Sequence, residues 1–169
     1  MNDLFQVFSA RRRRAMAFVV SIGVIGALGR SLLKTYASLH PPLYADDVYQ
    51  DVMTPIMNLA HPGERVFHSD WDEFPILFRL DDRLKYVAGL DPTFLYEASS
   101  TLSDAYREVT WGRVPPTPDQ VWELVHGRLQ ARFLFIAKTD HRALFEVVRA
   151  DGRYRLLAES SEAATFVVK

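Results

Sequence analysis

The chain has 169 residues, enough for one domain with an appendage, and its formal net charge is -1, from 20 Lys and Arg against 21 Asp and Glu. A hydrophobic share of 49% beside a charged share of 24% is typical of folded proteins and excludes disorder along the whole chain. The balanced charge argues against nucleic-acid binding, and the absence of cysteine excludes disulfides, cysteine-ligated zinc and a cysteine nucleophile.

The N-terminal part has the pattern of a membrane anchor. Residues 11–14 are four consecutive arginines, and residues 15–29 carry no charged side chain. Extended to position 36, this segment reaches the ~20 residues that a spanning helix needs, so we predict a transmembrane helix at 15–36. A cleavable signal peptide, a buried soluble helix and an interfacial helix are the alternatives.

The basic residues also predict an orientation. The arginine run outnumbers Arg30 and Lys34 beyond the apolar stretch, and the flank richer in basic residues normally stays in the cytoplasm. Residues 1–14 are therefore expected to be a cytoplasmic basic segment at the inner (cytoplasmic) membrane. Residues 37–45 are expected to be a linker, and residues 46–169 an extracytoplasmic α/β domain.

Helices and strands alternate along the predicted domain. Apolar periodicity and turn residues place helices from Asp46 to the turn at 61–64, and then at 70–80, 101–111, from Thr117 onward and at 141–150. The same criteria place strands at 65–68, 84–89, 132–137, 154–158 and 165–168, of which the last two are predicted to form a hairpin. Pro55 is expected to kink the first helix. Gly112 is expected to end the helix at 101–111 in a conformation with a positive φ.

Several helix starts carry capping signals. Asp70 with Glu73 three residues later forms a capping-box pattern, and Asp91 precedes a proline in the manner of an N-cap. Thr117, followed by proline and then by Gln120, is the strongest helix start in the chain. Each of these signals involves residues within three positions of one another, so the prediction of these helix starts depends on short segments of sequence.

The alternation of elements with short connections predicts an α/β fold: a small, mainly parallel, Rossmann-like sheet with helices on both faces. In such sheets ligands bind beyond the carboxyl ends of the strands. Polar side chains that follow three predicted strands would then share one rim, which suits a polar ligand or a divalent cation. The candidate ligand-binding residues are His68, Asp70, Trp71, Asp72, Asp91 and Lys138.

A purely structural interpretation of the same residues is equally specific. Asp70 and Asp91 would cap helices, and Trp71 would pack a loop onto the sheet. His126 and His141 are expected on solvated helix faces. No P-loop, dinucleotide fingerprint or nucleophile elbow occurs, so no catalytic residue, metal ligand or cofactor is assigned.

Two segments resemble a known family. Residues 63–78, GERVFHSDWDEFPILF, followed by residues 86–96, YVAGLDPTFLY, resemble the C-terminal soluble region of bacterial polytopic membrane proteins that look like GT-C-type glycosyltransferases. The resemblance covers roughly residues 15–169, with the last membrane helix included. It implies a domain of a protein that uses polyprenyl-phosphate sugars.

The resemblance also implies what this chain lacks. GT-C enzymes are similar to one another in carrying catalytic acidic residues in an early extracytoplasmic loop between membrane helices, and this chain has at most one such helix. We therefore expect a non-catalytic accessory domain that binds an acceptor or a partner. The implied partners are the lipid bilayer, other helices of a polytopic protein and a carbohydrate or polyprenyl-linked acceptor. The alternative is an independent membrane-anchored module that binds a small polar ligand or a protein.

Overall fold

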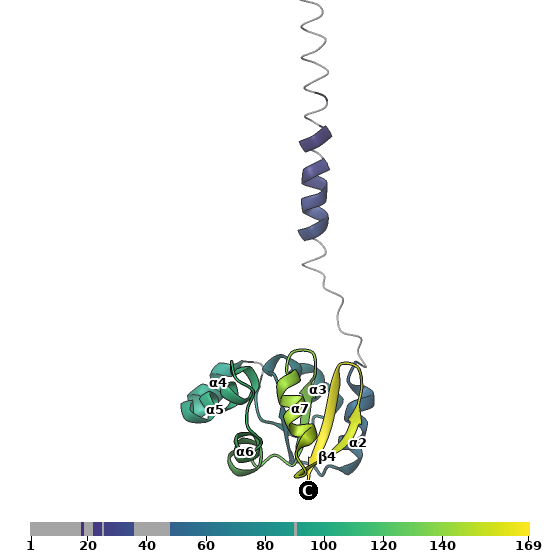
Figure 1. Ribbon diagram of the computed structural model, residues 1–169. Coiled ribbons are helices and arrows are strands. Elements are labelled where there is room, and N and C mark those ends of the chain that lie inside the picture. Colours follow the sequence, from purple (N-terminus) through teal and green to yellow (C-terminus); the bar gives the residue numbers. More distant parts are fainter. Residues whose placement is uncertain (1–17, 19–21, 25, 36–47, 90) are drawn as a thin grey trace, which may run out of the picture. The chain divides into compact units, whose positions relative to one another are not determined.

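The computed structural model describes residues 18, 22–24, 26–35, 48–89 and 91–169 (Figure 1). The chain forms two units, Met1–Ala45 and Asp46–Lys169, which we treat separately. In the first unit the described residues are helical and expose large apolar side chains, among them Phe18, Ile22 and Leu28.

The described part of the chain contains no helix that is both long enough and apolar enough to cross a membrane. The predicted basic segment and the whole predicted linker lie outside the described residues, as does part of the predicted span at 15–36. The orientation and the span therefore stay predictions.

A five-stranded mixed sheet forms the centre of the second unit. The strands are β1 (Arg65–His68), β2 (Lys85–Tyr86), β3 (Phe133–Ala137), β4 (Tyr154–Glu159) and β5 (Ala163–Val168). Their order in the sheet is β2-β1-β3-β5-β4. β1 is parallel to both of its neighbours, whereas β5 is antiparallel to both β3 and β4.

The predicted mainly parallel sheet is therefore wrong for the C-terminal half, although the α/β class and the terminal hairpin are confirmed. The physical reason is the hairpin itself. After the last helix the chain forms the edge strand β4 first and then turns back, so that β5 enters the sheet beside β3 in the opposite direction.

Helices pack on both faces of this sheet. On one face lie α2 (Gln50–Leu59) and α3 (Phe74–Leu80), the latter preceded by a short 3-10 turn, Trp71–Glu73. The other face is covered by α5 (Ser100–Trp111), by α6 (Pro118–Trp122) with its π-helical continuation Glu123–Arg128, and by α7 (Arg142–Ala150). Helix α4 (Pro92–Ala98) lies beside α5 (Figure 1).

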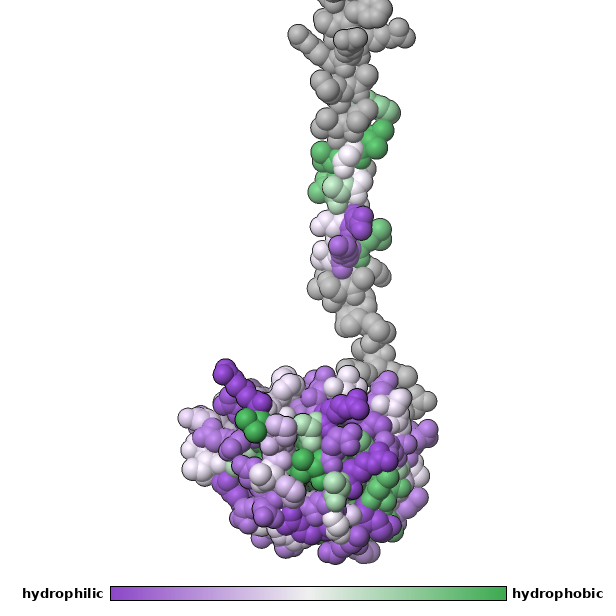
Figure 2. Space-filling view, in the orientation of Figure 1, coloured by the Kyte–Doolittle hydropathy of each residue, from purple (hydrophilic) through white to green (hydrophobic). Residues whose placement is uncertain are grey.

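The core is built around β3, whose five residues are all buried. Because successive side chains of a strand point to opposite faces, Phe133 and Phe135 pack against α2 and α3, while Leu134 and Ile136 pack against the other helices. Each face thus has its own hydrophobic core. The visible surface of the unit is mostly hydrophilic, with small separate apolar spots (Figure 2).

The predicted helix caps at Asp70, Asp91 and Thr117 are confirmed. The Asp70–Glu73 capping box is formed, the Asp91 carboxylate accepts from the Thr93 N–H at 2.8 Å, and Thr117 caps α6 reciprocally with Gln120. These interactions join residues within three positions of one another, so a sequence pattern is sufficient to specify them.

The predicted positive φ at Gly112 is wrong, because its φ is -58°. A glycine is nevertheless required there by a close approach of the backbone. A Cβ atom at this position would lie 2.2 Å from the carbonyl oxygen of Glu108. The glycine therefore lets the chain leave α5 by a turn that any larger residue would obstruct.

Candidate functional site

The carboxyl ends of β1 and β3 meet, as expected for adjacent parallel strands. The Ser69 N–H donates to the carbonyl oxygen of Phe135 at 3.1 Å, and the Ala137 N–H donates to the Ser69 hydroxyl at 2.9 Å. Two segments are joined by these bonds: the one that follows β1 and contains Asp70, and the one that follows β3 and contains His141. The Asp70 Oδ2 and His141 Nε2 atoms are consequently 3.4 Å apart.

His68 is fully buried beneath this junction. Its Nδ1 contacts the carbonyl oxygen of Asp70, and its Nε2 lies 2.9 Å from the carbonyl oxygen and 3.2 Å from the amide nitrogen of Ala88. The Tyr106 hydroxyl donates to the backbone oxygen of His68 at 2.8 Å. Burial lowers the pKa of His68 and so favours the neutral ring. His68 thus connects β1, the end of β2 and α5, and it supports the site from below.

Glu73 is a second buried polar group in this region, with 4% of its surface exposed. Its carboxyl group accepts hydrogen bonds from the Asp70 N–H and from the Ser69 hydroxyl, both at 3.1 Å. Burial raises the pKa of Glu73 to about 8, and the nearby carboxylates of Asp70 and Asp72 add to the increase. At neutral pH the carboxyl group is therefore mostly protonated.

Asp70 contacts Trp71 directly and is connected to Trp111 through His141. It accepts the N–H of Trp71 at 2.7 Å through Oδ1, while its Oδ2 faces His141. The His141 ring in turn packs edge-on against Trp111, with centroids 4.7 Å apart. Asp70 and His141 therefore link the positions of Trp71 and Trp111.

The prediction of a solvated His141 is wrong, because only 2% of its surface is exposed. The His141 N–H donates to the carbonyl oxygen of Ala137, which closes a turn at the end of β3 and directs the ring inward. Nδ1 pairs with the carbonyl oxygen of Thr110 at 3.0 Å, whereas Nε2 forms no hydrogen bond with any part of the chain that the structure describes. His126 is exposed, as predicted.

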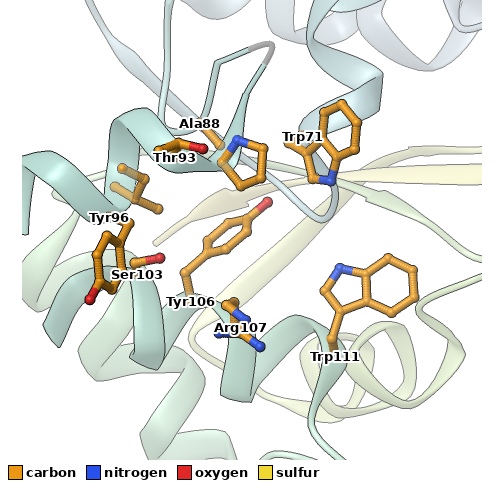
Figure 3. Close-up of a pocket in the computed structure, with 10 residues that line it drawn as sticks. Trp71, Ala88, Thr93, Tyr96, Ser103, Tyr106, Arg107 and Trp111 are labelled. Carbon is orange, nitrogen blue, oxygen red and sulfur yellow. The ribbon is translucent and has the colours of Figure 1, made fainter. Parts of the chain in front are cut away.

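An aromatic hollow of about 380 Å³ opens next to this pair (Figure 3). We call it the Trp71–Trp111 hollow. Its walls come from the segments that follow β1 and β2 and from helices α4 and α5, and they consist of Trp71, Ala88, Pro92, Thr93, Leu95, Tyr96, Ser103, Tyr106, Arg107 and Trp111. Trp71 and Trp111 are 41% and 55% exposed, and each turns the nitrogen edge of its indole toward the other (Figure 3).

Acidic groups flank the hollow. Burial raises the pKa of Asp72, and the negative charges of Asp70 and Asp140 raise it further. Asp72 follows Trp71 in the chain, and Asp140 precedes His141. Among the described residues no three His, Asp or Glu side chains are placed to hold a metal ion.

The remaining two candidates have other partners. Asp91 is exposed and caps α4, and its hydrogen bonds from Thr93 lower the pKa of its carboxyl group. Lys138 pairs with Glu159 at 2.8 Å and lies over the ring of Phe145 at 5.3 Å. The structure thus brings Asp70, Trp71 and Asp72 together but directs Lys138 to the β4–β5 hairpin.

Sequence reasoning missed the contribution of α5, although a signal was present. Ser103, Arg107 and Trp111 recur every four residues and thus share one helix face. The side chain of Tyr106 is buried, and its hydroxyl bonds the end of β1.

The chain matches no family model and no curated protein. Among solved structures it is similar to the C-terminal globular domain of an oligosaccharyltransferase from Archaeoglobus fulgidus. The identity is 13% and the TM-score 0.49, over 75% of this chain and 99% of that domain.

Proposed function

We propose that this chain is a non-catalytic accessory domain of a glycosyltransferase-like membrane protein, and that it binds an acceptor or a partner in the Trp71–Trp111 hollow. The two segments that resemble the glycosyltransferase-like proteins supply six of the ten residues that line the hollow. Trp71 belongs to the first segment, and Ala88, Pro92, Thr93, Leu95 and Tyr96 belong to the second. Residues that distinguish this kind of domain thus gather at one concave site, and this observation carries the proposal.

The test is reconstitution with a neighbouring gene product. A reading frame beside this one that encodes several membrane helices is expressed with or without this chain, and sugar transfer from a polyprenyl-phosphate donor is measured. We expect no transfer by this chain alone and transfer when both proteins are present. Trp71→Ala is expected to raise the acceptor KM by about fivefold or more, because it removes one wall of the hollow.

Trp122→Phe is the matched control, since Trp122 packs on His126 and Tyr154, away from the hollow. Transfer by this chain alone would contradict a non-catalytic role. If neighbouring genes encode no such membrane protein, the accessory role fails and an independent binding module is favoured.

In this proposal the domain lies outside the cytoplasm, on a helix at 15–36 that crosses the inner membrane. The support is the arginine run and the apolar side chains that the first unit exposes. Because the chain has no cysteine, Ser161→Cys in the exposed β4–β5 turn adds a single reactive thiol. A membrane-impermeant maleimide is expected to label it in intact spheroplasts.

Ser9→Cys, on the other side of the apolar stretch, is expected to react only after lysis. The reverse pattern would place the domain in the cytoplasm and overturn the orientation.

A further inference from the structure

The charges around the Trp71–Trp111 hollow restrict what it can bind. An anion would meet the carboxylates beside Trp71, because Asp70 and Asp72 flank this residue in the chain and the charges of Asp70 and Asp140 raise the pKa of Asp72. A cation would meet Arg107, which lines the hollow directly. A ligand without net charge avoids both penalties.

Three side chains that line the hollow can only donate hydrogen bonds. The indole nitrogens of Trp71 and Trp111 can donate but not accept, and the Arg107 guanidinium has the same character. The Tyr106 hydroxyl is already committed to the carbonyl oxygen of His68. A ligand that fits must therefore present several acceptor oxygens.

The shape of the hollow supplies the third restriction. Four of the ten residues that line the hollow are aromatic, and both indoles are about half exposed, so they present apolar faces to a ligand (Figure 3). A saturated hydrocarbon chain would match these faces but would leave the indole and guanidinium donors without acceptors, which costs free energy on burial. A hexopyranose ring has both an apolar face of C–H groups and a rim of hydroxyl oxygens.

We propose that the Trp71–Trp111 hollow binds a neutral hexopyranose unit of an oligosaccharide, with its C–H face on an indole and its hydroxyl oxygens facing the two indole N–H groups and Arg107. This inference rests on the proposed function, because it names the ligand class of the same site. Asp70 and His141 act as positioning residues, since they fix the positions of the two tryptophans relative to each other without lining the hollow.

The test measures saccharide binding by the full-length chain in a polyoxyethylene detergent, which carries neither a sugar nor a charge. The Trp122→Phe background leaves Trp71 and Trp111 as the two fluorescent tryptophans of the chain. The neutral probes are maltotriose, mannotriose and N-acetylchitotriose. The charged probes are trigalacturonic acid and fully deacetylated chitotriose, which have similar rings but opposite charges.

We expect at least one neutral trisaccharide to change the tryptophan emission with saturation, and both charged probes to bind more weakly. Measured by calorimetry, Trp71→Ala and Trp111→Ala are each expected to weaken binding by about tenfold, the equivalent of one lost aromatic face. Trp122→Phe is expected to leave the Kd unchanged.

If no neutral trisaccharide binds up to its solubility limit, the saccharide assignment is overturned. A blocked neutral peptide that binds instead, with the same dependence on Trp71 and Trp111, would assign the hollow to a peptide and leave the proposed accessory function in place. The proposed accessory function is tested separately. It would be contradicted if Trp71→Ala left sugar transfer in the reconstituted system unchanged.

Discussion

Replacing Glu73 by glutamine is expected to stabilise the protein at alkaline pH and to change its stability little at pH 5. In the folded protein the pKa of Glu73 is raised from 4.5 to about 8, so folding favours the protonated carboxyl group. The stability that this proton provides is complete below pH 4.5 and is lost as the pH rises through 8. The full difference is on the order of 5 kcal/mol, because one pKa unit corresponds to about 1.4 kcal/mol.

His68 has the opposite pH dependence. Its pKa is lowered from 6.5 by burial, so its contribution is complete above pH 6.5 and is lost as the pH falls below that value. Between pH 4.5 and 6.5 the two groups change the stability in opposite directions, so the histidine offsets part of the loss that Glu73 causes. From this pair we expect a decline that is steeper above pH 6.5 than below it. In Glu73→Gln the stability rises with pH below 6.5, because only the histidine still contributes.

Urea unfolding at a series of pH values measures this prediction. Glutamine keeps the size of the side chain and an oxygen that can accept the Asp70 N–H, so the capping box is retained. Glu97→Gln, at an exposed position of α4, is the matched control and is expected to follow the wild type. An equal stability difference between Glu73→Gln and wild type at pH 5 and pH 9 would show that Glu73 is charged in the folded protein.

The local features of this fold could be predicted because the groups that create them are neighbours in the chain. The Asp70–Glu73 capping box and the Thr117 cap each join residues three positions apart, and the sequence pattern specifies both. The five consecutive buried residues of β3 likewise identify a central strand. The direction of β5 has no such signal, since a hairpin strand pairs equally well at an edge or inside a sheet.

The partners of Lys138 depend on that same direction. Because β5 is antiparallel to β3, the β4–β5 turn lies at the carboxyl end of β3, where the Lys138 N–H donates to the carbonyl oxygen of Glu162. Glu159 lies at the same end of the sheet and pairs with the Lys138 ammonium group. In a parallel arrangement the turn would lie at the other end of the sheet, away from Lys138.

The aromatic hollow depends on contacts between distant residues. The Tyr106 hydroxyl meets the carbonyl oxygen of His68 across 38 positions, and His141 meets Trp111 across 30. The four-residue spacing of Ser103, Arg107 and Trp111 shows that these side chains share a face. It does not show that this face meets Trp71, because the packing of α5 against the ends of β1 and β2 decides that.

Replacing His68 by alanine is expected to be the most destabilising change at the site, by about 3–5 kcal/mol. The substitution leaves a cavity where a fully buried ring was, and it removes the partner of the Ala88 amide and of the Asp70 carbonyl oxygen. His61→Ala is the matched control: His61 is exposed in a turn, and its loss is expected to cost less than about 0.5 kcal/mol.

The consequence for the hollow follows from what His68 connects. Its ring joins the segment that contains Asp70 and Trp71 to the end of β2, while its backbone oxygen accepts from Tyr106 on α5. Amide hydrogen exchange should therefore quicken in His68→Ala at Trp71, at Ala88 and around Tyr106, but not in the β4–β5 hairpin. A uniform change over the whole domain would show that the ring only fills space, and a urea midpoint equal to that of His61→Ala would contradict the predicted loss of stability.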